Sequence, residues 1–178
     1  MIELRGKKVI LCTLEREHCR ELWEKYEPTD PLPTEPLNPG LSLEGADKWF
    51  EDMQAKQGRE QVCLGVFTQE GELVGDIQLA NINWRNRTAT VGLSIARQAD
   101  RGKGYGTDAT VTLLRFGFEH LGLYRVSAAI AEYNSGAQRI LEKCGFVQEG
   151  RERQAIYSGG RRWDRLVYGL LRTEFERP

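Results

Sequence analysis

The stretch "DRGKGYGTD" at residues 100–108 constrains the fold of this chain more than any other segment. It lies between a strand-like run, "TATVGLSIA" at 88–96, and a run with helical periodicity, "TDATVTLLRFGFEHLG" at 107–122. Glycine lets a ligand approach the main chain closely, and the amides at a helix N-terminus are unpaired and partly positive. The strand, loop and helix therefore favour an anion-binding site, although a plain connecting turn accounts for a lone G-x-G equally well.

Two common phosphate-binding motifs do not match this loop. The P-loop requires G-x-x-x-x-G-K-[ST], and no such string is present. The dinucleotide fingerprint G-x-G-x-x-G fails because, after Gly102 and Gly104, its third glycine would fall on Thr107. The loop is therefore expected to hold a phosphate in another way, with Lys103 adding positive charge.

Hydrophobic periodicity divides the rest of the chain into short elements. Strands are expected at 7–14, 61–68, 72–82, 88–96, 124–131, 146–157 and 161–172. Helices are expected at 15–27, 41–56, 107–122 and 135–145. Residues 28–40 hold five of the six prolines and are expected to be a loop. Because helices and strands mix without a repeat or a linker, we expect one α/β domain over residues 1–178.

Composition excludes several classes of protein. Lys and Arg number 25 against 26 Asp and Glu, for a net charge of −1, which gives no support to binding of nucleic acid. No apolar run approaches the length that spans a bilayer, so no membrane association is expected. The cysteines and the two histidines lack zinc-ligand spacing, so we expect no metal and free thiols in a reducing cytoplasm.

Two motifs together carry a resemblance to a known family. "RGKGYG" resembles the R/Q-x-x-G-x-G/A loop of the GCN5-related N-acetyltransferases (GNAT), with Arg101, Gly104 and Gly106 at the fixed positions. "YNSGAQRILEKCGFVQEG" resembles the N-x-x-A…EK-x-GF segment of the family. The matching residues there are Asn134, Glu142, Lys143, Gly145 and Phe146. The ending "YSGGRRWDRLVYGLL" resembles the final hairpin of the RimJ/RimL-like branch.

The resemblance implies a fold and a cosubstrate. The fold is a mixed, mostly antiparallel sheet with a splayed pair of central strands, flanked by helices. The cosubstrate is acetyl-CoA, without a metal. Its pyrophosphate is expected on the backbone amides of Arg101, Gly102, Lys103, Gly104, Tyr105, Gly106 and Thr107. A side chain added at Gly104 is expected to fill the space where the pyrophosphate approaches.

The resemblance also implies where the rest of acetyl-CoA lies. The pantetheine arm is expected beside "VGLSIA", where the splay leaves backbone groups near Ser94 and Ile95 free to pair with it or to polarise the thioester. Asn134 is expected to bond the same arm, and it also fits the N-cap of the following helix. Arg139 and Lys143 share one helix face and are either nucleotide-phosphate contacts or ordinary solvated charges.

This chain lacks the proton-transfer side chains that are common in the family. Acetyl transfer needs a neutral amine, so a base must take a proton, often through water. The tyrosine common in the family is replaced by Leu141, and the glutamates common in the central strand and the RimL-like hairpin are replaced by Thr90 and Ile156.

Three carboxylates remain as candidate bases: Asp164 on the last strand, Asp76 in "VGDIQL", and Glu132 before the asparagine motif. Each also fits a surface or structural role. Asp164 is the predicted base, because the final hairpin borders the acceptor site in this branch of the family.

The acceptor itself is not identified by the sequence. The resemblance implies a primary amine, either a protein N-terminus or a small molecule, in a pocket formed by residues 28–40, the helix after them and the turn 81–87. Trp84 in that turn is a pocket wall, a dimer contact or a simple loop anchor. By resemblance we expect a homodimer.

Two classes of function stay open. The first is an N-acetyltransferase in which the amine attacks acetyl-CoA directly. A covalent route through Cys144 is not expected, because that thiol lies at a helix C-terminus, where partial negative charge opposes a thiolate. The second is an acyl-CoA-binding sensor or partner protein with little turnover, which the missing tyrosine and glutamates favour.

Overall fold

The computed structural model describes residues 2–27 and 42–175. The described strands are β1 (Glu3–Arg5), β2 (Val9–Thr13), β3 (Val62–Thr68), β4 (Leu73–Asn83), β5 (Thr88–Ile95), β6 (Arg125–Ala131), β7 (Val147–Ser158) and β8 (Arg161–Leu171). The described helices are α1 (Arg16–Lys25), α2 (Leu43–Lys56), α3 (Tyr105–Glu119) and α4 (Ser135–Lys143), with a 3-10 turn, η1, at Gln98–Asp100. None of these helices is long and apolar enough to cross a membrane.

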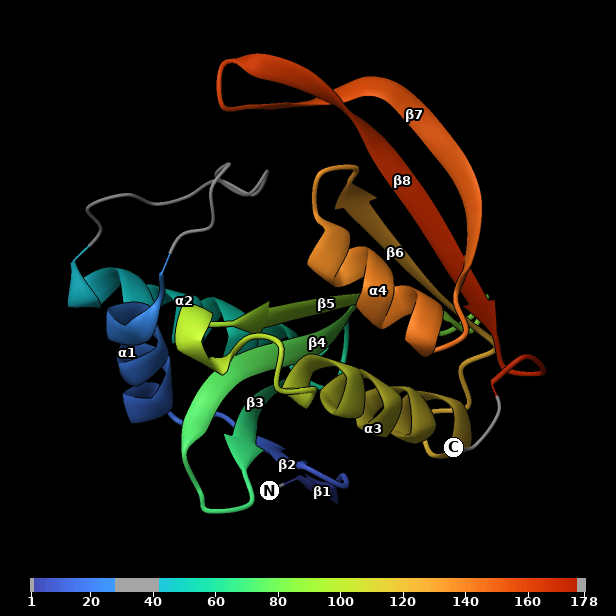
Figure 1. Ribbon diagram of the computed structural model, residues 1–178. Helices are drawn as coiled ribbons and strands as arrows, with labels where there is room; N and C mark the ends of the chain where they lie inside the picture. Colours follow the sequence, from blue (N-terminus) through green and yellow to red (C-terminus); the bar gives the residue numbers. More distant parts are fainter. Residues whose placement is uncertain (1, 28–41, 176–178) are drawn as a thin grey trace.

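The eight described strands form one sheet in the order β1-β2-β3-β4-β5-β6-β8-β7. Neighbouring strands are antiparallel except β5 and β6, which are parallel (Figure 1). A parallel pair needs a long crossover, and here the glycine loop and α3 provide it. The hairpin β7–β8 turns at Gly159 and Gly160, whose φ angles of 59° and 77° suit a tight two-residue turn.

The central parallel pair separates soon after it begins. Only Thr88, Ala89 and Thr90 of β5 pair with β6, through the segment 125–127. Both strands continue beyond this point, β5 to Ile95 and β6 to Ala131, but they no longer pair with each other. The sequence-based expectation of a mostly antiparallel sheet with a splayed central pair is therefore confirmed.

Helices cover both faces of the sheet. On one face, α3 and α4 enclose the larger core, which includes Ile77, Leu79, Leu113 and Phe118. On the other face, α1 and α2 enclose a smaller core with Cys19, Leu22, Met53 and Cys63. Figure 1 shows α1 and α2 grouped apart from α3 and α4, with the β7–β8 hairpin extending away from both pairs.

Most expected elements occur within a few residues of their predicted bounds. Two short elements, β1 and η1, were not predicted from the sequence. β1 has three residues, and its place depends on pairing with β2 rather than on its own periodicity. The expected loop at 28–40 lies outside the described residues.

Candidate active site

The glycine loop ends in the first turn of α3. Gly104 precedes the helix with φ 89°, a backbone conformation that favours glycine. The first helical hydrogen bond of α3 runs from the Asp108 amide to the Gly104 oxygen, at 3.1 Å. The amides of Tyr105, Gly106 and Thr107 therefore precede the helical hydrogen-bond ladder, as an anion site at a helix N-terminus requires.

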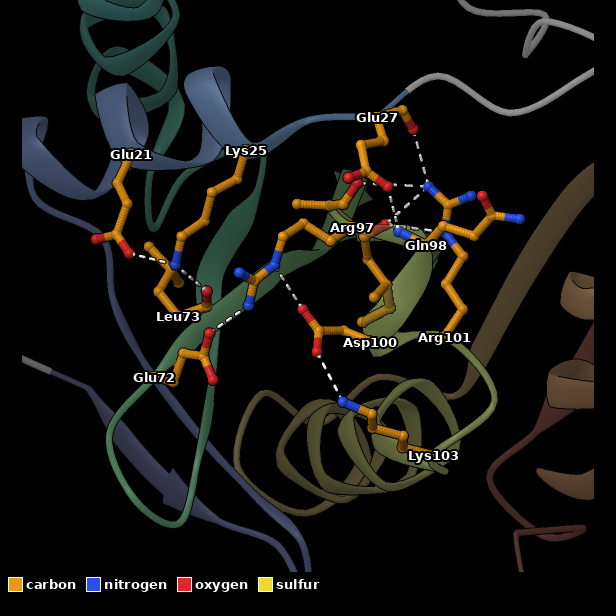
Figure 2. A network of polar contacts seen from close by, with 12 residues as sticks. Glu21, Lys25, Glu27, Glu72, Leu73, Arg97, Gln98, Asp100, Arg101 and Lys103 are labelled. Carbon is orange, nitrogen blue, oxygen red and sulfur yellow. Dashed lines mark hydrogen bonds and ion pairs between the residues drawn. The ribbon is translucent and has the colours of Figure 1, made fainter.

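Arg101 uses its side chain to fix this loop. Its guanidinium donates to the Ile95 oxygen at the end of β5 and to the Glu27 oxygen after α1, at distances of 3.0–3.2 Å (Figure 2). Its backbone amide donates to the Gln98 oxygen at 3.1 Å and is not free for a phosphate. The backbone amides predicted to bind the pyrophosphate are therefore reduced to those of Gly102–Thr107. Arg101 instead positions the loop.

Lys103 is held by a buried carboxylate. Its ammonium lies 3.0 Å from Asp100, which is 5% exposed and also pairs with Arg97 at 2.9 Å (Figure 2). Arg97 continues to Glu72 in the β3–β4 turn. Although burial opposes it, hydrogen bonds from Lys103 and Arg97 lower the pKa of Asp100. Asp100 therefore stays charged and orients Lys103 beside the loop.

The turn between β1 and β2 docks against the same end of α3. The Asp108 carboxylate accepts the amides of Lys7, Lys8 and Val9 at 2.6–3.1 Å. The Lys8 ammonium then reaches the Lys103 oxygen at 2.9 Å. About a hundred residues separate these partners in sequence, so no local pattern could have revealed the contact.

This docking adds a second constraint at Gly104, beside the expected space for the pyrophosphate, which stays a prediction. A Cβ added there would lie 3.0 Å from the Lys8 ammonium, so it would point at the β1–β2 turn. A Cβ at Gly106 would lie 2.9 Å from both Leu93 and Ile140. Gly106 therefore allows β5, α3 and α4 to meet closely, next to the splayed strands.

The backbone groups of Ser94 and Ile95 point to opposite edges of β5. The Ser94 oxygen points at Gly75 of β4, only 2.0 Å from where a Cβ on that glycine would lie. Successive residues of a strand direct their backbone groups to opposite edges, so the Ile95 amide faces the gap toward β6. Of the two predicted pantetheine contacts, Ile95 is thus the one with a backbone amide toward the gap.

The second motif builds α4. The Asn134 side chain caps the helix by accepting the Ala137 amide at 3.0 Å, as its alternative role predicts. Arg139 and Lys143 are exposed on this helix, and neither forms an ion pair with another described residue. Their charges are available to a ligand, and their assignment to acetyl-CoA stays a prediction.

The positions where family members carry proton-transfer groups are occupied by inert side chains. Leu141 and Ile156 are buried, at 5% and 6% exposure. The Thr90 hydroxyl donates to the Ala80 oxygen at 3.2 Å and accepts from Asn81 at 3.1 Å. None of the three supplies an acid or a base.

Asp164, the predicted base, belongs to an ion-pair cluster. Its carboxylate pairs with Arg151 and accepts the Gln154 amide at 2.8 Å. These contacts lower its pKa, the Gln154 hydrogen bond most. Glu132 joins the cluster through the same Arg151 and through the Asp164 amide at 2.9 Å. A carboxylate stabilised as an anion accepts a proton poorly, so this geometry disfavours Asp164 as the base.

Asp76 has the opposite environment. It lies on the face of β4 toward α1, near Cys19 and Cys63. Burial raises its pKa to about 7, opposed only by its own backbone amide. Among residues 2–27 and 42–175, no cation pairs with it. It nevertheless keeps part of its surface accessible.

Cys144 is a core residue. It is 7% exposed at the C-cap of α4, and burial raises the pKa of its thiol to about 12. A thiol so strongly protonated is a weak nucleophile. In the described part of the chain no group of three or more His, Cys, Asp and Glu could hold a metal ion.

Trp84 anchors its turn. Its indole donates to the Arg59 oxygen at 2.6 Å, while 48% of the residue stays exposed. Of its three expected roles, the contact favours the loop anchor. The exposed face leaves a contact with another molecule possible in addition.

Comparisons with known proteins agree with this architecture. The chain matches the Acetyltransferase (GNAT) domain family over residues 8–147. It is 37% identical to "Putative ribosomal N-acetyltransferase YdaF" of Bacillus subtilis over 60% of this chain, and the match spans 58% of that protein's length. It is 32% identical to "Spermidine N(1)-acetyltransferase" of Vibrio cholerae over 58% of this chain and 59% of that protein.

Solved structures resemble the whole described fold. A crystal structure named "Probable acetyltransferase" has a TM-score of 0.82 at 27% identity, covering 98% of this chain and 99% of that one. The Vibrio cholerae spermidine N-acetyltransferase in complex with CoA and spermine has a TM-score of 0.82 at 23% identity, covering 93% and 96%.

The chain therefore belongs to the GNAT acetyltransferase family. This confirms the resemblance seen in the two motifs and the fold expected from it. Family membership makes acetyl-CoA the cosubstrate. The first turn of α3 lies beside β5 and α4, because a Cβ on Gly106 would lie 2.9 Å from both Leu93 and Ile140.

Proposed function

We propose that this protein transfers the acetyl group of acetyl-CoA directly to a primary amine. The observation that carries the proposal is the coincidence of two features at one place. The unpaired amides of the α3 first turn lie where β5 leaves β6, so a phosphate anchor and a free strand edge meet. A ligand with a pyrophosphate and an amide-bearing arm matches both.

The cofactor residues follow from this arrangement. Gly102–Thr107 hold the pyrophosphate, with Lys103 near it, and Ile95 offers its amide to the arm or to the thioester oxygen. Asn134, Arg139 and Lys143 contribute from α4. Asp100 and Arg101 position the loop without touching the ligand.

The acceptor is a small-molecule amine or a protein N-terminus. Both kinds occur among the similar proteins, whose names include a spermidine acetyltransferase and ribosomal acetyltransferases. The region between the β7–β8 hairpin and α1–α2 is the place we propose for it. Four free cysteines agree with a reducing cytoplasm as the site of action.

We also propose a homodimer formed through the edge of β7. This strand ends the sheet, spans twelve residues and exposes Val147 at 55% and Tyr157 at 66%. An uncovered edge strand with exposed apolar groups is suited to pairing with a second copy.

Mass spectrometry tests the proposed reaction. The protein is incubated with acetyl-CoA and, separately, spermidine, a peptide with an N-terminal serine, and free amino acids. We expect one class to gain an acetyl group, with intersecting initial-velocity lines. A protein that binds CoA by calorimetry but acetylates none of these amines would instead support the acyl-CoA-binding alternative.

A further inference from the structure

One strip of the sheet combines polar side chains with access to the splayed strands. Asp76, Gln78 and Ala80 of β4 lie directly opposite Ser94, Gly92 and Thr90 of β5. Side chains of directly opposed residues share a face of the sheet. Gln78 also lies opposite Cys63, a member of the core beneath α1 and α2, which identifies the face.

Within this strip only Asp76 carries an ionisable group. Thr90 occupies the position where family members carry a glutamate, and its hydroxyl is already bonded to Asn81 and Ala80. The Asp76 carboxylate has no side-chain partner among the described residues, and it keeps some accessible surface. Among the described residues of this strip, Asp76, directly or through a bonded water, is therefore the candidate proton acceptor.

A small residue separates Asp76 from the gap. On this face of β5, Ser94 lies directly opposite Asp76, and the side chain of Gln78 lies over Gly92. A larger residue at Gly92 would contact Gln78, whose amide nitrogen would lie 3.3 Å from the added Cβ. The carboxylate is one strand away from the gap, within reach of a bridging water.

We propose that Asp76 is the general base that takes the proton from the acceptor ammonium, directly or through one water. This inference rests on the proposed acetyl transfer. It places the base on β4, on the strand next to the β5 position where the family glutamate would stand, and it replaces Asp164 in that role.

The chemical step balances without another reactant. Asp76 takes one proton from R–NH3+, and the neutral amine attacks the thioester carbonyl carbon. The C–N bond forms as the C–S bond breaks, and the thiolate of CoA takes the second amine proton. Asp76 then releases its proton to solvent, so the products are the acetamide, CoA–SH and H+.

The electrostatic surroundings suit this task. Among the described residues, the titratable groups that face Asp76 are the thiols of Cys19 on α1 and Cys63 on β3, and burial raises the pKa of both. Both are neutral near pH 7, so Asp76 titrates without a charged neighbour. A carboxyl whose pKa is about 7 accepts a proton near neutral pH far better than an ordinary aspartate.

The test compares Asp76→Asn with Asp76→Glu and with the control Asp52→Asn, which makes the same change on the exposed face of α2. The acceptor is spermidine or the serine peptide, whichever the wild type acetylates faster. We expect Asp76→Asn to lower kcat by about 100-fold at pH 7 with unchanged affinity for CoA, and Asp76→Glu to restore part of the loss.

The pH profile separates a base from a structural residue. The wild-type rate should rise with pH through an apparent pKa near 7, and this limb should vanish in Asp76→Asn. The difference in kcat between the wild type and Asp76→Asn should become smaller above pH 9, where more of the amine is already neutral. Unchanged kcat and an unchanged profile in Asp76→Asn would overturn the inference and leave the proposed function standing. A wild type that acetylates no amine would overturn both.

Discussion

At the residue scale, two aspartates of this protein show how surroundings decide chemistry. Asp164 is ion-paired with Arg151 and accepts the Gln154 amide, which lowers its pKa. Asp76 pairs with no cation in the described part of the chain, and burial raises its pKa. The first carboxylate supports the β7–β8 hairpin near its turn, because it accepts the Gln154 amide within the bulge between Glu152 and Ile156. The second is poised to exchange a proton.

The raised pKa of Asp76 predicts a pH-dependent stability. Its contribution is fully present below the unfolded pKa near 4 and is lost as pH rises through about 7. We expect Asp76→Asn to gain stability relative to wild type between pH 5 and pH 8, by at most about 4 kcal/mol. Thermal unfolding at several pH values measures this. A difference in Tm that does not change with pH, or that Asp52→Asn reproduces, would contradict it.

Cys144 predicts a negative result. Because its thiol is buried with a pKa of about 12, Cys144→Ala should keep most of the transferase activity and lose about 1 kcal/mol of stability or somewhat more from the smaller side chain. Initial-velocity kinetics check the route. Ping-pong patterns, or an acetylated Cys144 peptide isolated without acceptor, would show that the thiol takes part.

At the element scale, the N-terminus of α3 depends on a distant turn. Asp108 binds the β1–β2 turn through three amides, and Lys8 returns a hydrogen bond to the loop. Arg101 and Asp100 fix the other side of the loop. The cofactor loop is thus held between the first hairpin, the end of α1 and the end of β5, and it is preorganised before a ligand arrives.

Gly104 is the point where this arrangement is most sensitive. Gly104→Val should weaken CoA binding at least about tenfold and cost about 1–3 kcal/mol of stability, because φ 89° strains a branched residue and the side chain displaces Lys8. Calorimetry and thermal unfolding measure the two effects. Gly58→Val is the control, since Gly58 also has a positive φ, 74°, but no neighbour within 4 Å of an added Cβ. Equal loss of CoA affinity in both variants would refute a specific role of the loop.

At the scale of the whole molecule, the hairpin β7–β8 leaves one long edge of the sheet uncovered by the rest of the described chain (Figure 1). We expect a dimer in sedimentation at micromolar concentration, and we expect Tyr157→Arg to shift it toward monomer. Tyr124→Arg is the matched control, because Tyr124 is also exposed, at 49%, but lies before β6. A wild-type monomer at high micromolar concentration would exclude the β7 interface.

The sequence by itself determined the family, the order of most elements and the place of the phosphate loop. These features are local, because a glycine at positive φ, an N-capping asparagine or a run of one periodicity acts on its immediate neighbours. Asn134 illustrates this, since its cap follows from the helix that starts one residue later.

Only the tertiary structure decided which carboxylate is free. Asp164 meets Arg151 and Glu132 across two strand pairings, and Asp108 meets a turn about a hundred residues away. Asp76 is largely buried near Cys19 of α1, and no cation among the described residues pairs with it. The pKa of a carboxyl group depends on the groups that surround it in space. The local sequence around an aspartate in a strand does not show whether its carboxylate is ion-paired, hydrogen-bonded or unpaired.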